Sequence, residues 1–340
     1  MARFLTEDIE TLLREGRNLL AFSAGVDSSA LFHILLEAGI DFDMAFVNYG
    51  LRQQAEEEEE YAKRLARSHG KKLYSTNAPR FGSNFEARAG RFRYDFFEEL
   101  IESHGYDRLL TAHQLNDRLE WFFMRMVRGA GTVELAGMAQ SDERITKSGR
   151  RYLRVKPLLK YEKRELLDYL EERGYSYYID ESNFCDSYER NRFRERYGNP
   201  LIEEYGEGIL RTLEYLDRDR KLIRSLYSDI YDNGEMKIVF MKEETIADRA
   251  CDDALKRSGY LMSMAEREEV LRKESLVVGR RWSVERRGGY LFVAPYMQGL
   301  EVPKDFRERC RILGIPPKIR KYLYAREIEP ESIAELTDIG

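Results

Sequence analysis

The sequence has few cysteines and no long hydrophobic run. Only three of its 340 residues are cysteine, Cys185, Cys251 and Cys310, and they are far apart. They form neither a CxxC pair nor a zinc-ligand spacing, which argues against a zinc site or a disulfide framework and is typical of a reducing compartment. No apolar run approaches about 18 residues, which argues against a membrane-spanning helix. Residues 1–8 lack the apolar core of a signal peptide, so we expect a cytoplasmic protein.

Positive charge is not in excess either. The chain has 56 lysines and arginines against 61 acidic residues, a formal net charge of −5, which excludes a general polyanion binder of the histone kind. The charge is unevenly spread, because residues 56–60 are five consecutive glutamates whereas residues 144–164 contain nine lysines and arginines. Such a basic segment is compatible with a localised nucleic-acid contact, and equally with ordinary solvated charge.

The length and the alternation of segments indicate the fold class. A chain of 340 residues exceeds one typical core, so we expect two or three domains. Short apolar segments at 19–22, 44–49 and 109–112 alternate with segments of helical periodicity, which predicts an α/β domain with a parallel sheet and helices on both faces. Residues 201–231 have a helical pattern without a strand partner, and the apolar runs within 281–293 predict a hairpin.

The segment 19–36 is the one around which the chain is organised. An apolar run that predicts a buried strand is followed by a short polar loop and then by apolar residues at helical spacing. The loop consists of Ser23, Ala24, Gly25, Val26, Asp27, Ser28 and Ser29. A helix that starts after such a loop offers backbone N–H groups and its positive dipole end to an anion, and serine hydroxyls can add hydrogen bonds to phosphate oxygens. An N-cap serine cluster before a core helix is the alternative, but it does not account for Asp27.

The loop lacks the lysine of a Walker-type loop and the GxGxxG spacing of a dinucleotide site. It resembles instead the SGGxDS motif of the PP-loop ATP pyrophosphatases, in which the motif binds the pyrophosphate of ATP and the aspartate assists magnesium. The resemblance implies that residues 23–29 bind ATP and that Asp27 has a catalytic, metal-binding role. Ala24 stands where the superfamily usually has glycine, which affects how closely the backbone approaches the pyrophosphate.

Further motifs resemble those of one PP-loop family, the tRNA(Ile)-lysidine synthetases. They follow one another in the family's order between residue 16 and about residue 200. The resembling segments are residues 48–52 (HxxHGLR in the family), 84–94 (NxExxARxxRY, with Gly90 in place of an arginine), 113–121 (HHxDDxxET), 128–131 (RGxG) and 180–194 (DxxN followed by RNxxR). Five blocks in order are much more specific than one short loop.

The resemblance implies roles for individual residues. Catalytic roles fall to Asp27, Asp117, Glu120 and His113; lysine or phosphate binding to Glu86, Arg93 and Arg128; tRNA binding to Arg151, Arg154, Arg190, Arg192 and Arg194; and magnesium binding to Asp27 and Asp117. Independently of the resemblance, Asp117 and Glu120 are three residues apart, so on a helix they share a face and can hold a cation or an ammonium group together. A structural role for His113 and a solvated helix for the arginines are the alternatives.

The implied reaction converts the wobble cytidine of a tRNA(Ile) with a CAU anticodon to lysidine. ATP with Mg2+ adenylates the oxygen on carbon 2 of the base, and free L-lysine then displaces AMP. We expect a catalytic domain (1–200), a helical connector (201–235) and a smaller mixed α/β domain that contacts tRNA (236–340), with a homodimer as one option. The alternatives are a tRNA thiolase, which the cysteine spacing disfavours, an ammonia-using synthetase, and a non-catalytic tRNA-binding relative.

Overall fold

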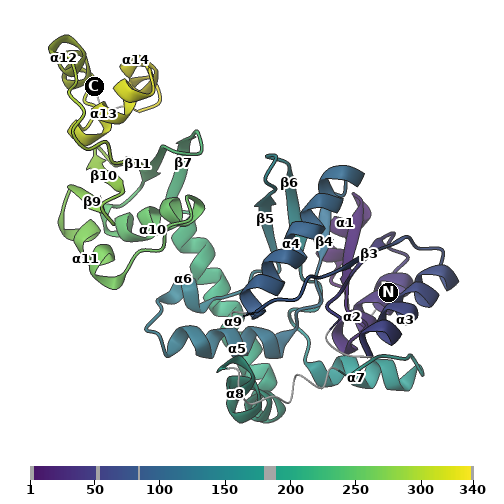
Figure 1. Ribbon diagram of the computed structural model, residues 1–340. Coiled ribbons are helices and arrows are strands. Elements are labelled where there is room, and N and C mark those ends of the chain that lie inside the picture. Colours follow the sequence, from purple (N-terminus) through teal and green to yellow (C-terminus); the bar gives the residue numbers. More distant parts are fainter. Residues whose placement is uncertain (1–3, 51–53, 83–84, 180–188, 338–340) are drawn as a thin grey trace. The chain divides into compact units, whose positions relative to one another are not determined.

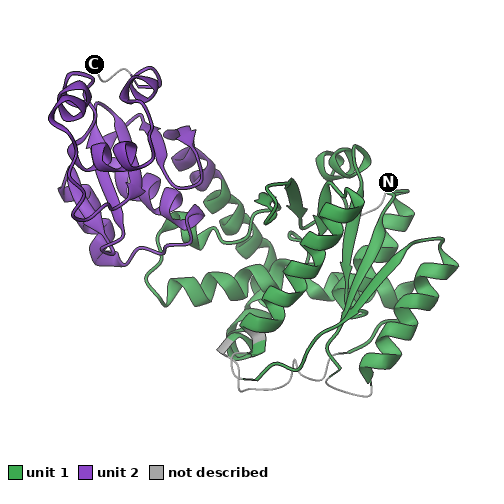
Figure 2. Ribbon diagram, turned by 45° about the horizontal axis from the view of Figure 1, so that its top comes forward, with its two compact units in different colours: residues 1–217 green, residues 218–340 purple. Residues whose placement is uncertain are grey.

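The computed structural model describes residues 4–50, 54–82, 85–179 and 189–337, apart from the side chain of Glu86. The chain divides into two compact units, residues 1–217 and 218–340 (Figure 2). Each unit has its own sheet and its own hydrophobic clusters, so each is described by itself. Over the described ranges, no helix is both long enough and apolar enough to cross a membrane.

Unit 1 is built on a six-stranded sheet in the order β3-β2-β1-β4-β6-β5 (Figure 1). Its strands are β1 (Asn18–Phe22), β2 (Asp43–Asn48), β3 (Leu73–Asn77), β4 (Arg108–Leu110), β5 (Ser141–Ile145) and β6 (Arg151–Val155). All neighbouring strands pair in parallel except β5, which runs antiparallel to β6 at one edge. The predicted parallel α/β sheet is confirmed, and part of the basic segment forms its antiparallel edge.

Helices cover both faces of this sheet. On one face the core includes residues of α1 (Glu7–Arg14), α2 (Val26–Glu37), α3 (Gln54–Ser68) and α7 (Lys163–Glu172), and on the other it includes residues of α4 (Phe85–His104). Strand β1 contributes to both cores, because Leu20 and Phe22 belong to the first and Leu19 to the second. A strand that is buried on both faces needs apolar residues at every position, which explains its unbroken apolar run.

The remaining helices of unit 1 follow β4 and α7 in the chain. They are α5 (Leu115–Met126), α6 (Thr132–Leu135), α8 (Glu189–Phe193), one π-helical turn η2 (Arg194–Gly198) and α9 (Asn199–Arg224). Helices α5 and α9 share a small core formed by Leu115, Leu119, Ile202 and Leu213. Helix α9 is kinked at Tyr205, and the boundary between the two units lies within it.

Unit 2 contains a five-stranded antiparallel sheet in the order β7-β8-β11-β10-β9. Its elements are β7 (Tyr227–Asp232), β8 (Lys237–Met241), η3 (Glu244–Ile246), α10 (Ala247–Arg257), α11 (Met264–Arg272), β9 (Ser275–Val278), β10 (Trp282–Arg287), β11 (Tyr290–Pro295), α12 (Lys304–Ile312), α13 (Pro317–Ala325) and α14 (Pro330–Ala334). Two hydrophobic clusters, one with α10 and α11 and the other with α12, α13 and α14, include residues of this sheet. The predicted hairpin is confirmed as β10 and β11.

The helical pattern predicted over residues 201–231 is wrong at its carboxyl end. Helix α9 ends at Arg224, and Ile230 lies in β7, which pairs with β8 and contains a bulge between Asp229 and Tyr231. Aromatic and β-branched side chains suit a strand at least as well as a helix. The pairing with β8 therefore decides the conformation, and the local periodicity does not reveal it.

Candidate functional site

The loop between β1 and α2 is held together by its own hydrogen bonds. The N–H group of Ser23 donates to Ser28 Oγ (3.2 Å), and the two hydroxyl oxygens are 3.1 Å apart. The Ser28 hydroxyl also donates to the carbonyl oxygen of Gly25 (3.1 Å), and the buried Ser29 hydroxyl donates to that of Ala24 (3.3 Å). The loop is therefore a fixed turn at the amino end of α2, where backbone N–H groups attract an anion.

Ala24 adopts a left-handed backbone conformation, with φ of +62°. Glycine takes up such a conformation without strain, whereas alanine does so at a cost, which explains why glycine suits this position. The carbonyl oxygen of Ala24 accepts a hydrogen bond from the N–H group of Tyr178 (2.9 Å), and the methyl group is fully buried. Packing thus holds the loop in the shape that glycine would give it.

Asp27 has a buried carboxylate oxygen, Oδ1, that has no hydrogen-bond partner in the described part of the chain. Burial and the negative charge of Asp117 raise the pKa of Asp27 to about 7, although Lys163 and Arg194 oppose the shift. The carboxylates of Asp27 and Asp117 repel each other, and that of Asp27 has an oxygen without a hydrogen-bond partner among the described residues. A cation between the two would remove the repulsion and bind that oxygen. Magnesium commonly binds one or two carboxylates together with substrate phosphates, and these two aspartates could hold it. No cluster of three metal-ligating side chains occurs among the described residues.

Helix α5 positions the next two carboxylates. At its amino end the N–H group of Gln114 donates to Asp117 Oδ2 (3.2 Å), and that of Asn116 donates to Gln114 Oε1 (2.5 Å). These bonds fix Asp117 in the first turn, and Glu120 lies one turn further along the same face. Both residues are almost fully buried, with exposed fractions of 7% and 2%.

Two arginines bind both carboxylates, and we call these four side chains the charged cluster. Arg194 donates to Asp117 Oδ1 (3.0 Å) and to Glu120 Oε2 (3.0 Å). Arg190 donates to Asp117 Oδ1 (3.2 Å) and to Glu120 Oε1. The sequence assigns both arginines to tRNA phosphates, whereas in the structure their guanidinium groups neutralise the carboxylates.

The charged cluster shifts the pKa of both acids, in opposite directions. Burial alone would raise the pKa of Asp117, but the positive charges of the His113 ring in its protonated form and of Arg194 and Arg190 outweigh it and lower that pKa. Burial raises the pKa of Glu120 despite the two arginines. Asp117 is thus the more firmly ionised of the two, as a ligand for a cation should be.

His113 and Lys163 complete the site. His113 Nδ1 lies 3.0 Å from Thr111 Oγ1, and burial lowers the pKa of His113 to about 4, so its ring is neutral at pH 7. Lys163 starts α7, and its positive charge opposes the rise in the pKa of Asp27. None of the sequence motifs singles out Lys163. The signal that points to it is its position after β6, at the sheet edge where ligands of α/β folds bind.

The other predicted site residues are more scattered. Arg93 is exposed on α4 and hydrogen-bonds Tyr49 at the end of β2. Arg154 binds Asp142 through two nitrogens (3.2 and 3.0 Å), and Arg151, which is exposed, pairs with Glu143 (3.3 Å).

Two more predicted site residues are exposed. Arg128 comes just after α5, eight residues beyond Glu120, which is about 12 Å along a helix axis. Arg192 lies in α8. The side chain of Glu86 and residues 180–188, which include Cys185, lie outside the described residues.

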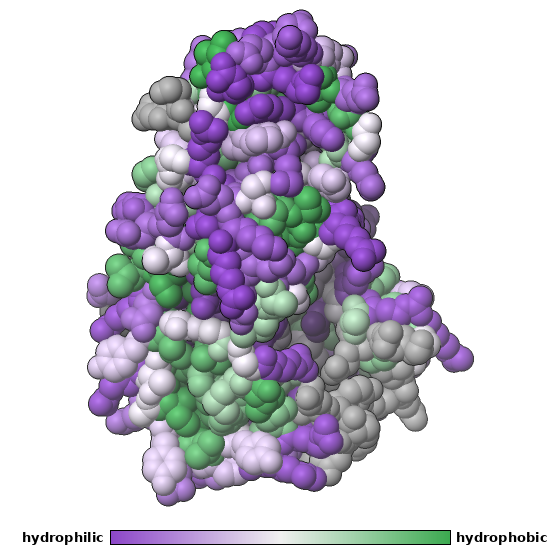
Figure 3. Space-filling view, turned by 90° about the vertical axis from the view of Figure 1, so that its left-hand side faces the viewer, coloured by the Kyte–Doolittle hydropathy of each residue, from purple (hydrophilic) through white to green (hydrophobic). Residues whose placement is uncertain are grey.

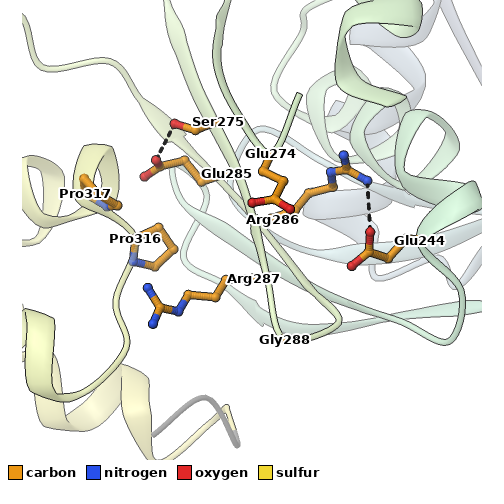
Figure 4. A pocket seen from close by; sticks show the side chains of 9 residues that line it. All are labelled: Glu244, Glu274, Ser275, Glu285, Arg286, Arg287, Gly288, Pro316 and Pro317. Carbon is orange, nitrogen blue, oxygen red and sulfur yellow. Dashed lines mark hydrogen bonds and ion pairs between the residues drawn. The ribbon is translucent and has the colours of Figure 1, made fainter. Parts of the chain in front are cut away.

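Two cavities have linings that include no residue of the charged cluster. One of about 340 Å³ in unit 1 is lined by residues of α4 together with Thr76 and Lys147. The other, of about 320 Å³, is in unit 2 and is lined by Glu285, Arg286 and Arg287 among others (Figure 4). Glu285 accepts hydrogen bonds from the Ser275 hydroxyl (2.6 Å) and from the backbone N–H at position 318 (2.6 Å), so it caps the start of α13.

Comparison with known proteins identifies the family. Residues 2–201 match the family model of the PP-loop domain. The tRNA(Ile)-lysidine synthase of Campylobacter jejuni subsp. jejuni is 39% identical over 335 residues, which cover 97% of this chain and 99% of that protein. The chain belongs to the tRNA(Ile)-lysidine synthase family. The synthase of Helicobacter pylori strain J99 is 38% identical over 315 residues, covering 92% of this chain and 90% of that protein.

A solved structure supports the same fold. The U34-tRNA thiolase NcsA from Methanococcus maripaludis, with its [4Fe-4S] cluster, superimposes with a TM-score of 0.50 at 19% identity, covering 63% of this chain and 76% of that one. At this identity the likeness concerns the fold alone. Membership of the lysidine synthase family confirms the resemblance seen in the sequence, including the enzyme class and the PP-loop fold.

Proposed function

We propose that this protein joins free L-lysine to carbon 2 of the wobble cytidine in tRNA(Ile) with a CAU anticodon. The reaction takes place in the cytoplasm and converts ATP to AMP and pyrophosphate. The observation that carries the proposal is the position of two buried carboxylates, Asp117 and Glu120, next to a phosphate-type loop whose Asp27 has an unpartnered oxygen. The loop serves the nucleotide, and the carboxylate pair serves the amine.

In the first step, the loop and α2 bind the β and γ phosphates of ATP. The backbone N–H groups at the start of α2 and the hydroxyl of Ser23, which is exposed, face the phosphate oxygens. Magnesium, when bound, neutralises phosphate charge and assists the departure of pyrophosphate. Asp27 and Asp117 are the residues that would hold it, since their mutual repulsion disappears once a cation lies between them.

In the second step, Asp117 and Glu120 orient the side-chain amine of lysine. A buried pair of carboxylates suits an ammonium group because charge-assisted hydrogen bonds are strong where water is excluded. Arg190 and Arg194 form ion pairs with these carboxylates. Phosphate oxygens compete for the same guanidinium groups, so ATP binding draws the arginines away and prepares the carboxylates for lysine.

The cytosine must leave the anticodon loop to reach these groups, because its reacting carbon is otherwise part of a stack of bases. The neutral ring of His113 and the carboxylate of Asp117 would accept a hydrogen bond from the exocyclic amine of cytosine; both groups carry acceptor atoms at pH 7. Uracil has a carbonyl oxygen at that position and would be rejected. The three predicted tRNA-binding arginines outside the charged cluster, Arg151, Arg154 and Arg192, contribute phosphate contacts and hence salt-dependent affinity.

The proposal is tested by incubating the protein with tRNA(Ile), ATP, Mg2+ and L-lysine and analysing the nucleosides by mass spectrometry. We expect cytidine at the wobble position to gain the mass of lysine minus water, with one AMP and one pyrophosphate per modified tRNA. Formation of ADP and phosphate would contradict cleavage between the α and β phosphates. A thiolated nucleoside, or modification with ammonia in place of lysine, would favour the other PP-loop enzymes.

A further inference from the structure

Helix α5 has two halves of different character. Residues 115–120 are all buried, whereas none of residues 121–127 is, although six of these seven are apolar or aromatic. Met126 and Val127 at its end are 46% and 57% exposed. A helix segment that is apolar on all sides is normally buried, so a segment left partly exposed marks an interaction site.

Three rings next to this segment form a cluster that we call the aromatic layer: Phe123, Phe193 and Tyr197. The rings of Phe123 and Phe193 are stacked, with centroids 6.4 Å apart and an interplanar angle of 16°. Tyr197 contacts both, with centroid distances of 6.4 Å to Phe123 and 5.9 Å to Phe193. Its side chain is 51% exposed, and the other two are partly exposed, so the layer faces solvent.

The aromatic layer adjoins the charged cluster. Each ring follows one member of that cluster by three residues on the same segment: Phe123 follows Glu120, Phe193 follows Arg190, and Tyr197 follows Arg194. Three residues on a helical segment amount to roughly 5 Å along its axis. If the cytidine reacts at the carboxylates of the charged cluster, a neighbouring nucleotide of the same strand therefore lies within reach of the rings.

The charge around the aromatic layer is positive. Residues 121–131 contain two arginines and no acidic residue, and Arg125 lies over the ring of Trp121 at 4.5 Å. Arg192 and Arg196 are exposed beside the rings, with Glu195 as the one acid between them. Figure 3 shows hydrophobic side chains gathered in the lower part of the face that it presents. Aromatic rings combined with arginines are the surfaces on which unpaired RNA bases stack.

We infer that the aromatic layer is a stacking surface for an unpaired base of the anticodon loop, adjacent to the reacting cytidine. The inference rests on the proposed function, because it takes the charged cluster as the place where the cytidine reacts. Stacking on rings is independent of base identity, so the layer would hold the loop open while the choice of cytidine is made at the carboxylates. A second copy of the chain is the competing occupant. It would match the positive charge here only if its own acidic residues faced these arginines.

The test measures the binding of an anticodon stem–loop RNA to three variants of the full chain. Tyr197→Ala should weaken binding about fivefold to a hundredfold, because stacking contributes this much per base. Tyr197→Phe should bind like the wild type, since it keeps the ring. Tyr215→Ala, a tyrosine of α9 with a similar exposure of 53%, should also bind like the wild type. A thermal unfolding curve of each variant checks that it folds like the wild type.

A fluorescent base provides a second readout. With 2-aminopurine on either side of the cytidine, we expect quenching by the wild type at one of the two positions and loss of that quenching in Tyr197→Ala. Equal affinity of Tyr197→Ala and the wild type would overturn the inference, and so would loss of binding in Tyr197→Phe. A concentration-dependent dimer that disappears in Tyr197→Ala would show that a second copy covers the layer. Absence of lysidine in the wild-type reaction would instead contradict the proposed function.

Discussion

At the scale of the residue, the charged cluster separates the two steps of the proposed reaction. Glu120→Gln removes a charge that holds the amine but leaves the phosphate loop intact. Loss of a charge-assisted contact in a buried site costs about 2 to 3 kcal/mol, or roughly 30- to 150-fold. We expect the lysine concentration at half-maximal rate to rise by this factor. The release of pyrophosphate from ATP in the presence of tRNA should persist.

A matched control is Glu143→Gln, which changes an exposed carboxylate that pairs with Arg151. It should leave both steps unaltered. If Glu120→Gln loses ATP binding and keeps its lysine requirement, the assignment of Glu120 to the amine is wrong. The measurement is a pair of steady-state assays, one following pyrophosphate and one following lysine incorporation.

A buried histidine predicts a specific dependence of stability on pH. His33 is 5% exposed and stacks on Tyr175 with centroids 3.5 Å apart, and burial together with the charge of His69 lowers the pKa of His33 to about 4. In the unfolded chain the same group binds a proton near pH 6.5. The unfolded state therefore gains protons first on acidification, and the stability present above pH 6.5 is lost as the pH falls towards 4, by about 3 kcal/mol.

His33→Phe keeps a ring against Tyr175 and removes the titration. The difference in unfolding free energy between the variant and the wild type should therefore change by about 3 kcal/mol in favour of the variant between pH 7 and pH 4. Urea denaturation of both proteins at four or five pH values measures it. A constant difference across this range would show that His33 is not kept neutral by the fold.

A glycine inside a helix gives a prediction about stability alone. Gly90 lies in α4, at the position where the lysidine synthetase motif has an arginine, and a Cβ atom added there would meet nothing within 4 Å. Gly90→Ala should raise the unfolding free energy by about 1 kcal/mol, because alanine loses less backbone entropy. In Gly206→Ala the added atom would displace the carboxylate of Glu162, so this control should gain less stability than Gly90→Ala.

Some of these residues follow from the sequence and others do not. The shared face of Asp117 and Glu120 follows from a spacing of three, which is a local property of a helix. Their pairing with Arg190 and Arg194 spans 70 residues or more, and only the tertiary fold determines it. The proximity of Lys163 to Asp27 likewise depends on the tertiary fold. The spacing of the two residues in the sequence therefore does not indicate it.

At the scale of the element, the strands that are buried on both faces were predicted well. Strands β1 and β2 contain unbroken apolar runs, at residues 19–22 and 44–47, because each faces a helical layer on both sides. The sequence does not predict the edge pair β5 and β6, because β5 consists mostly of exposed polar residues and arginines interrupt β6, so neither is an unbroken apolar run. Residues 227–231 fall within the predicted helix for a related reason: local periodicity does not indicate their pairing with β8.

The segment formed by α8 and η2 yields a prediction that distinguishes two roles for its arginines. If Arg194 serves the carboxylates, Arg194→Ala leaves Arg190 as the one arginine of the charged cluster for two buried carboxylates and lowers stability, by up to about 3 kcal/mol, without ATP. The dependence of tRNA affinity on salt should then change little. If Arg194 contacts a phosphate instead, the logarithmic salt slope should fall by about one unit and stability should be unaffected.

Arg192→Ala is the internal control, because Arg192 is exposed on the same segment. We expect it to preserve stability and to reduce the salt slope. Denaturation curves and filter-binding titrations at several salt concentrations, performed on both variants, give all four quantities. The same result for both variants would contradict a difference in role.

At the scale of the whole molecule, the two units have separate hydrophobic clusters. Those of unit 1 surround the parallel sheet and the α5–α9 contact, and those of unit 2 surround the antiparallel sheet. Helix α9 is the element in which the boundary falls. Units with separate cores unfold separately unless the shared element couples them.

ATP with Mg2+ therefore should stabilise one unit and not the other. The proposed nucleotide site is confined to unit 1, so at a ligand concentration of about 100 times the dissociation constant its stability rises by about 2.7 kcal/mol. For a unit of this size, that corresponds to an increase in melting temperature of roughly 5 to 10 °C. The transition of unit 2 should stay where it is.

The chain provides a reporter for each unit, because its two tryptophans are Trp121 in unit 1 and Trp282 in unit 2. In Trp282→Phe the fluorescence follows unit 1 alone, and in Trp121→Phe it follows unit 2 alone. Thermal melts of both variants with and without ATP and Mg2+ should show the shift in the first and none in the second. Equal shifts in both would mean that α9 transmits nucleotide binding to unit 2, and no shift in either would remove the nucleotide site from the loop at residues 23–29.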